Sequence, residues 1–118
     1  MKLEGEGLLV RIFVGESDRW DGASLYEAIV QRARDKGLAG ATVLKGIEGF
    51  GAHNFIHTTR VDRLAEDLPI VIEIVDQREK VEAFLPELDE MIPEGLVTLE
   101  PVQVILYRAR DGGSGATH

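Results

Sequence analysis

The order of apolar patterns along the chain limits the fold more than any other feature of its 118 residues. Four runs are rich in strand-forming apolar residues, and two stretches carry apolar residues at helical spacing. The strand-like runs cover residues 8–15, 41–47, 70–75 and 96–107, and the helix-like stretches lie between Ser24 and Gly37 and between Asp76 and Pro93. The order β-α-β-β-α-β predicts an α+β, ferredoxin-like fold, in which a four-stranded antiparallel sheet carries both helices on one face.

Both helices carry local signals that predict how they begin, bend or end. Ser24 and Glu27 form a capping-box pattern, in which each side chain accepts a hydrogen bond from the other residue's backbone N–H. Gly37 follows the last apolar position of the first helix and is typical of a left-handed helix stop. Pro86 falls inside the second helical pattern and is predicted to kink that helix, because proline lacks a backbone N–H.

One face of the expected sheet has no helix to cover it. Apolar residues are expected on that face, among them Leu9, Phe13, Ile105 and Tyr107. A large apolar face exposed to water is uncommon in a monomer. We therefore expect the chain to associate with copies of itself through this face. The alternative is that the long loop between the second and third strands folds over it.

Composition and charge exclude several classes of function. The chain has no cysteine, which removes disulfides, thiolate zinc sites, iron–sulfur clusters and cysteine nucleophiles. Its net charge is −8, and an acidic chain is a poor general ligand for nucleic acid. The excess acid lies in residues 62–100, whose net charge is −9, whereas residues 1–61 hold eight acids and eight bases. An anionic ligand is therefore expected on the first half, unless the acidic segment is only a solvated helix face.

Length and hydropathy predict the organisation of the chain and its location. The size favours a single domain over residues 1–110, followed by a Gly/Ser-rich tail over 111–118 that is expected to be disordered. The apolar runs fall far short of the roughly 20 residues that span a bilayer, and the charged N-terminus has no apolar signal core. We expect a cytoplasmic protein that does not insert into a membrane.

Several blocks of the sequence have a familiar order and spacing. They are residues 11–20 (RIFVGESDRW), 25–29 (LYEAI), 37–43 (GLAGATV), 46–51 (GIEGFG), 56–58 (IHT) and 64–69 (LAEDLP). Through these blocks the chain, from about residue 7 to about residue 107, resembles a small bacterial and archaeal family of PII-like domains, which is related to the nitrogen-regulatory PII proteins.

This resemblance implies an assembly and a class of ligand. PII proteins are trimers of ferredoxin-like subunits that bind ATP or ADP in clefts between subunits, and a long loop after their second strand contacts target proteins. Here Gly49-Phe50-Gly51 resembles the Gly-Phe-Gly at the base of that loop, and residues 52–68 take the place of the loop. The resemblance therefore implies a homotrimeric regulatory protein whose 52–68 loop contacts a partner such as a transporter or an enzyme.

One segment departs from the PII pattern. PII proteins hold phosphates with a glycine-rich, lysine-containing segment after the second helix, whereas residues 92–101 of this chain contain one glycine, no lysine and two glutamates. These carboxylates would repel a triphosphate unless a metal ion intervened. The expected ligand is therefore a small anion bound between subunits near residues 45–60, and ADP, AMP and ATP held in another way are the candidate nucleotides.

The candidate ligand-binding residues are mainly glycines and cations of the first half. Glycines let backbone amides approach a phosphate closely, and basic side chains supply positive charge. The candidates are Arg11, Trp20, Lys45, Gly46, Gly49, Phe50, Gly51, His53, His57 and Arg60. Alternatives stay open for several of them. The glycines can form a bulge and a hinge, and Arg11 can pair with Glu16 or Glu73. Trp20 either packs on the first helix or a neighbouring subunit, or stacks on a flat ligand.

Two other classes of function have weaker support. His53 and His57 are four residues apart, a spacing that suits a divalent metal on a helix, but both lie in a predicted loop and no metal ligand is assigned. The alternative function is therefore a metal-binding or purely structural trimer. A small enzyme ranks third and no catalytic residue is assigned, because the sequence has no Ser-centred elbow, Walker loop or metalloprotease motif.

Overall fold

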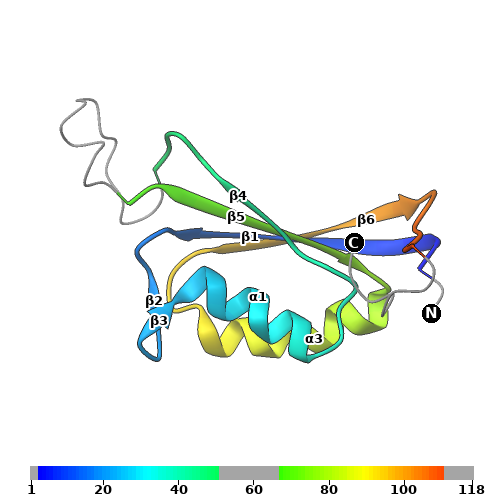
Figure 1. Ribbon diagram of the computed structural model, residues 1–118, viewed down its shortest axis with the longest axis horizontal. Helices are drawn as coiled ribbons and strands as arrows, with labels where there is room; N and C mark the ends of the chain where they lie inside the picture. The colour runs from blue at the N-terminus through cyan, green and yellow to red at the C-terminus, as the bar shows by residue number, and fades with distance from the viewer. Residues whose placement is uncertain (1–2, 51–66, 111–118) are drawn as a thin grey trace.

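The computed structural model describes residues 3–50 and 67–110 of the chain (Figure 1). The elements are β1 (Gly5–Gly15), β2 (Arg19–Trp20), β3 (Ala23–Ser24), α1 (Leu25–Asp35), β4 (Thr42–Lys45), β5 (Pro69–Asp76), α3 (Arg78–Met91) and β6 (Leu96–Val104). The predicted tail over 111–118 and most of the 52–68 loop lie outside the described residues. Within the described parts, no helix is both long and apolar enough to cross a bilayer.

Four strands form one antiparallel sheet in the order β4-β5-β1-β6. Both helices lie on the same side of this sheet, and β2 and β3 form a small separate hairpin before α1 (Figure 1). This arrangement confirms the predicted α+β, ferredoxin-like fold. Two strands end earlier than the sequence pattern predicts, since β4 ends at Lys45 rather than Ile47 and β6 ends at Val104 rather than Tyr107.

The hydrophobic core lies between the sheet and the helices. Alternate residues of the two central strands point into it, because successive side chains of a strand point to opposite faces. These strand residues are Leu8, Val10, Ile12 and Val14 of β1 and Ile70, Ile72 and Ile74 of β5. The helices supply the matching apolar positions Leu25, Ile29, Ala33, Val81, Phe84, Leu88 and Met91. Every one of these side chains is buried. Val43 of β4 and Val97 and Leu99 of β6 share this face at the two sheet edges and are 39%, 37% and 43% exposed, so the packing is complete only over the central strands.

The two ends of α1 differ in how well the sequence signals them. The predicted capping box is wrong, because the Ser24 side chain makes no capping hydrogen bond. The β2–β3 hairpin brings the preceding loop back onto the helix instead, and the Leu25 backbone N–H donates to the Asp18 carbonyl oxygen at 2.8 Å. The predicted stop at Gly37 is confirmed. Gly37 has a φ of 82°, and the Leu38 N–H donates to the Ala33 carbonyl oxygen at 3.1 Å, as in a Schellman motif.

The second long helix contains the proline that the sequence places there. The α3 helix runs from Arg78 to Met91 with Pro86 inside it, and Pro86 lies on the exposed side. The expected kink stays a prediction. The helix begins at Arg78, after the N-cap residue Gln77, and the carboxylate of Asp76 accepts a hydrogen bond from the Gln77 backbone N–H at 2.7 Å.

Candidate ligand-binding site

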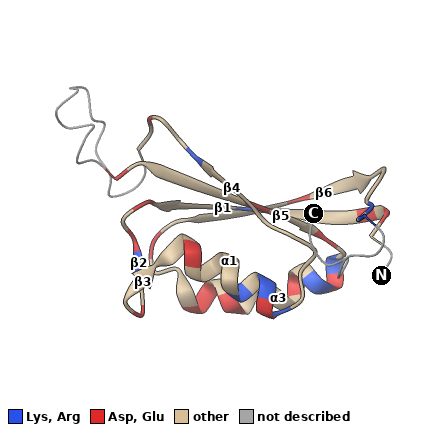
Figure 2. Ribbon diagram, viewed as in Figure 1, with Lys and Arg blue, Asp and Glu red and all other residues tan. Residues whose placement is uncertain are grey.

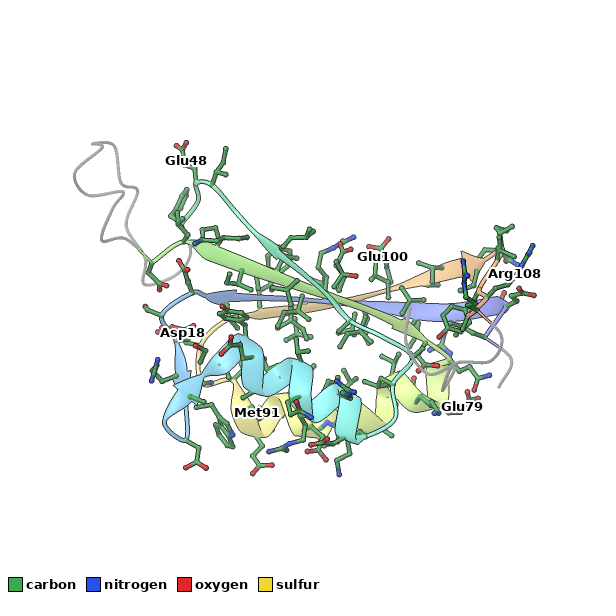
Figure 3. The ribbon with its side chains drawn as sticks, in the orientation of Figure 1. Asp18, Glu48, Glu79, Met91, Glu100 and Arg108 are labelled. Atoms are coloured by element: carbon green, nitrogen blue, oxygen red, sulfur yellow. The ribbon has the colours of Figure 1, made fainter. Side chains whose placement is uncertain are left out.

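The face of the sheet away from the helices carries a different set of side chains. Residues that lie directly opposite one another on paired strands share a face. The open face therefore holds Leu9, Arg11 and Phe13 of β1 beside Val71, Glu73 and Val75 of β5, with Thr42 and Leu44 of β4 and Leu96, Thr98 and Glu100 of β6 at its edges. Glu100 points away from the helices (Figure 3). This open face combines apolar residues with half-buried charge.

An ion network occupies the centre of the open face. Arg11 Nε lies 2.8 Å from a carboxylate oxygen of Glu73 on β5, and an Arg11 Nη nitrogen lies 3.4 Å from Glu100 on β6. The hydrogen bond to Glu73, together with both negative charges, raises the pKa of Arg11 above its ordinary value. One cation thus links three strands and two carboxylates, and the network keeps one excess negative charge.

A cavity of about 490 Å³ opens at one end of this face. It is lined by Leu3, Gly40, Thr42, Glu73, Val75, Val104, Leu106, Tyr107 and Arg108. Thr42 lies directly opposite Glu73 in the β4–β5 pairing, and Glu73 lies opposite Arg11 in the β1–β5 pairing, so a polar row leads from the ion network into the cavity. Small-molecule sites typically have volumes of about 300–1,000 Å³ and combine apolar walls with a few polar groups. The cavity therefore has the size and the lining of a site for a small polar ligand.

The C-terminal segment after β6 forms one wall of the cavity. The Tyr107 backbone N–H donates to a carboxylate oxygen of Glu4 at 3.1 Å, and the Tyr107 hydroxyl contacts the Ala39 carbonyl oxygen at 3.5 Å. These contacts hold Leu106 and Arg108 beside the start of β4, more than 60 residues earlier in the chain. Arg108 lies at the end of the sheet opposite to the one marked by Glu48 (Figure 3).

Comparisons with known proteins agree with this fold. Residues 7–104 match the family model DUF190, described as "Uncharacterized ACR, COG1993". The chain belongs to the DUF190 family. A UPF0166 protein of Aquifex aeolicus is 40% identical over 97 residues, which cover 82% of this chain and 91% of that protein.

Two solved structures share the fold of this DUF190 chain at low sequence identity. A protein of Thermus thermophilus described as PII-like signalling matches with a TM-score of 0.58 and 21% identity, over 89% of this chain and 94% of that one. The CPII protein of Thiomonas intermedia, solved with ADP and bicarbonate, matches with a TM-score of 0.57 and 21% identity, over 87% and 91% of the two chains. The DUF190 chain therefore has a PII-like, ferredoxin-type fold, as the sequence resemblance predicts.

A second group of candidate residues lies at the base of the 52–68 loop. Lys45 Nζ lies 2.8 Å from a carboxylate oxygen of Glu16, and this hydrogen bond raises the pKa of Lys45. The Gly46 N–H donates to the Pro69 carbonyl oxygen at 2.7 Å. A Cβ atom on Gly46 would lie 2.6 Å from Pro69 Cγ, and one on Gly49 would lie 3.3 Å from it. Pro69 therefore leaves no room for a side chain at Gly46 and little at Gly49. The expected ligand role of these glycines, and the bulge and hinge that were its alternative, stay predictions.

The loop between β1 and β2 is hydrogen-bonded to residues 67 and 68, at the base of the 52–68 loop. The Ser17 N–H donates to Asp67 Oδ1 at 2.6 Å, and the Glu16 N–H donates to the Leu68 carbonyl oxygen at 2.8 Å. Asp18 closes the turn by accepting the Gly15 N–H at 2.9 Å. The backbone amides of Gly15, Glu16 and Ser17 are thus already bonded within the chain.

The other sequence candidates are distributed over different parts of the DUF190 chain. Arg11 pairs with Glu73, as one of its two expected partners, and Trp20 is half-buried against the core beside α1. Phe50 is exposed, with 68% of its surface accessible. Gly51, His53, His57 and Arg60 lie outside the described residues. In the parts that the structure does describe, no three His, Asp or Glu side chains lie together as a metal site requires.

The cavity lining consists of residues that sequence reasoning did not select. The lining includes none of the described candidates, which are Arg11, Trp20, Lys45, Gly46, Gly49 and Phe50. Arg11 is linked to the lining indirectly, because it pairs with the lining residue Glu73. Thr42, Tyr107 and Arg108 come together only because β6 returns beside β1 and delivers the C-terminal segment to the start of β4. The one sequence signal was that two of the five basic residues after residue 61, Arg108 and Arg110, directly follow the last apolar run.

Proposed function

We propose that this chain is a PII-like regulatory protein that binds an adenine nucleotide, ADP or AMP, in the open-face cavity. The cavity itself carries the proposal, because it has the volume and the mixed lining of a small-molecule site in a fold that CPII shares with ADP bound. In this proposal the protein is a homotrimer, acts without catalysis, and presents residues 52–68 to a partner protein such as a transporter or an enzyme.

The lining offers complementary groups for each part of a nucleotide. Val75, Val104 and the Tyr107 ring provide apolar surface on which a base can pack. Thr42 and Glu73 supply a hydroxyl and a carboxylate that can bond to ribose hydroxyls or an amino group. Arg108 is the cation of the lining, and its planar guanidinium suits bidentate binding of a phosphate.

The charge around the cavity favours a nucleotide with few phosphates. Glu73 lies in the lining, and Arg11 is already engaged by Glu73 and Glu100. Arg108 therefore faces the phosphates without help from Arg11. A triphosphate brings more negative charge than this lining offsets, so we propose that ADP and AMP bind more tightly than ATP.

The open face supports association of three copies. Leu44 and Leu96, at its two edges, are 50% and 55% exposed in the single chain. A neighbouring subunit that covers this face would bury them and would close the open side of the cavity. We propose that residues 45–60 of the neighbour, with Lys45 and the loop-base glycines, complete the ligand site.

The base of the 52–68 loop supports a partner surface. Ile47 is 81% exposed and Phe50 is 68% exposed, and both lie just before the loop. Two large apolar side chains that face water so close together in the chain are typical of a protein contact.

Calorimetry with ADP, AMP and ATP tests the nucleotide site. The wild type is expected to bind ADP and AMP more tightly than ATP, and Arg108→Ala is expected to weaken ADP binding roughly tenfold or more, since a charge-assisted bond is lost. Arg34→Ala is the matched control, because Arg34 is an exposed arginine of the helix layer. Absence of heat with every nucleotide, or equal ADP affinity in both variants, would contradict the proposed site.

A further inference from the structure

Asp76 is a buried acid that does not line the cavity and has no place among the proposed ligand contacts. It is the last residue of β5, it is fully buried, and in the described parts of the chain it is the one charged residue inside the core region. Its two carboxylate oxygens have separate partners. Oδ1 accepts the Gln77 N–H at 2.7 Å at the start of α3, and Oδ2 accepts the Ala39 N–H at 2.9 Å.

The bond to Ala39 reaches the segment that forms the cavity wall. Ala39 precedes Gly40 and Thr42, which line the cavity, and its carbonyl oxygen contacts the hydroxyl of Tyr107, another lining residue, at 3.5 Å. On the other side, Asp76 follows Val75, which also lines the cavity. One carboxylate therefore joins the end of β5 to the segment that leads into β4 and lines the cavity with Gly40 and Thr42.

A helix start alone does not require this residue. Asp76 precedes the N-cap residue Gln77, and a serine, threonine or asparagine there could accept the Gln77 N–H without burying a charge. Burying a carboxylate is costly unless all its oxygens are bonded, and here both oxygens are used. The carboxylate differs from those neutral side chains in having a second acceptor oxygen, and that oxygen accepts the Ala39 N–H.

A second hydrogen bond, from Lys80, also holds the segment between α1 and β4, but at a different residue. Lys80 Nζ on the first turn of α3 donates to the Gly37 carbonyl oxygen at 3.0 Å, two residues before Ala39. This bond is exposed and holds the end of α1, whereas the Asp76 bond is buried and holds the residue next to the cavity. The two contacts can therefore be separated by mutation.

We infer that Asp76 is a positioning residue of the ligand cavity, which fixes the Gly40–Thr42 wall against β5. This inference rests on the proposed nucleotide site. It assigns the affinity of that site in part to a residue that does not touch the ligand.

The test compares Asp76→Asn with two controls. Asparagine keeps the shape but has one acceptor oxygen, so its NH₂ group must face one of the two backbone N–H donors. Lys80→Gln removes the neighbouring tie, and Met91→Ala destabilises the far end of α3, which Met91 marks in Figure 3. Each variant is examined in the full chain, well below its unfolding temperature, by ADP calorimetry and by amide hydrogen exchange of Gly40 and Thr42.

Two results are expected of Asp76→Asn alone. Its dissociation constant for ADP should rise roughly tenfold, the effect of leaving a buried donor unpaired. The amides of Gly40 and Thr42 should exchange at least about tenfold faster relative to the Ile72 amide in the centre of the sheet, for the same reason. Lys80→Gln and Met91→Ala should leave both quantities near the wild-type values.

The outcomes separate this inference from the proposed function. If Asp76→Asn leaves the exchange of Gly40 and Thr42 unchanged, or if Met91→Ala changes ADP affinity and exchange equally, Asp76 acts on stability only and the inference is wrong. If the wild type binds no ADP, the proposed function fails. The exchange data from the unliganded protein then still decide whether Asp76 holds the wall.

Discussion

The two faces of the sheet differ in what their side chains do. The face toward the helices is packed with aliphatic residues such as Val10, Ile12 and Ile72, all of them fully buried. The open face carries the Arg11 ion network, the cavity and half-exposed leucines. Charged residues are more frequent along the two helices than along the strands (Figure 2). The covered face supplies the core of the subunit, and the proposed function assigns the open face to the ligand and to neighbouring subunits.

Substitution of two successive residues of β1 gives the largest expected contrast. Ile12 points to the helices and is fully buried, whereas Phe13 points to the open face and is half-buried. Ile12→Ala should lower the free energy of unfolding by about 2–5 kcal/mol at any protein concentration, because it leaves a cavity in the core. Phe13→Ala should lower the free energy of unfolding less, and by an amount that depends on protein concentration, because it weakens contacts between subunits in the proposed trimer.

Urea unfolding at several protein concentrations measures both effects. A larger, concentration-independent loss in Phe13→Ala than in Ile12→Ala would mean that the open face also stabilises the single subunit, and the functional division between the two faces would be lost.

The assembly should respond to charge placed on the open face alone. Leu96 lies at the edge of that face opposite Phe13, so Leu96→Asp should convert the proposed trimer to subunits of single-chain mass. Ala83→Asp is the matched control, since Ala83 is exposed on the helix layer and should leave the assembly intact. Size-exclusion chromatography with light scattering distinguishes the two masses. A wild type of single-chain mass would remove the trimer from the proposed function.

The sequence predicted most of the fold because periodicity directly reports which side of each element is buried. The alternation in β1 and β5 and the helical stripe in α3 were sufficient to set the sheet and its covered face. The ends of elements were less predictable. At the start of α1 the Leu25 N–H is bonded to the backbone of Asp18 in the loop before β2, and the Ser24 side chain makes no cap, so the local capping pattern gave a wrong expectation.

The site was harder to predict, because its residues are brought together by strand pairing and not by spacing. Thr42, Glu73 and Arg108 lie far apart in the sequence and meet only through the β4–β5 and β1–β6 pairings. Glycines drew attention to residues 46–51, and at Gly46 the neighbouring Pro69 leaves no room for a side chain. The ligand role of the candidates near residues 45–60 stays a prediction.

Removal of Arg11 tests how the open face balances its charges. Without Arg11, Glu73 in the cavity lining and Glu100 beside it lose their shared cation. Arg11→Met should therefore weaken nucleotide binding severalfold, and the loss should increase from AMP to ADP to ATP with the number of phosphates. The double variant Arg11→Met/Glu73→Gln should recover part of the loss for ATP. Calorimetry at low and high salt measures these differences, and an equal loss for all three nucleotides would show that Arg11 acts only through packing.

The smallest expected effect concerns an ion cluster between the helices, on the side of the molecule away from the site. Glu87 on α3 pairs with Arg32 on α1 and lies 3.2 Å from Lys36 Nζ. The hydrogen bond from Arg32, followed by the one from Lys36, lowers the pKa of Glu87 below its ordinary value of 4.5. A carboxylate with a lowered pKa stabilises the fold above its unfolded-state pKa, and this contribution disappears as the pH falls through the folded-state pKa.

Urea unfolding from about pH 6 to about pH 3 should show a shallower loss of stability in Glu87→Gln than in the wild type, because the glutamine does not titrate. ADP affinity of this variant at neutral pH should equal that of the wild type, since Glu87 lies in the helix layer. If ADP affinity changed with Glu87→Gln, the helix layer would contribute to the ligand site and the two faces of the sheet would not be independent.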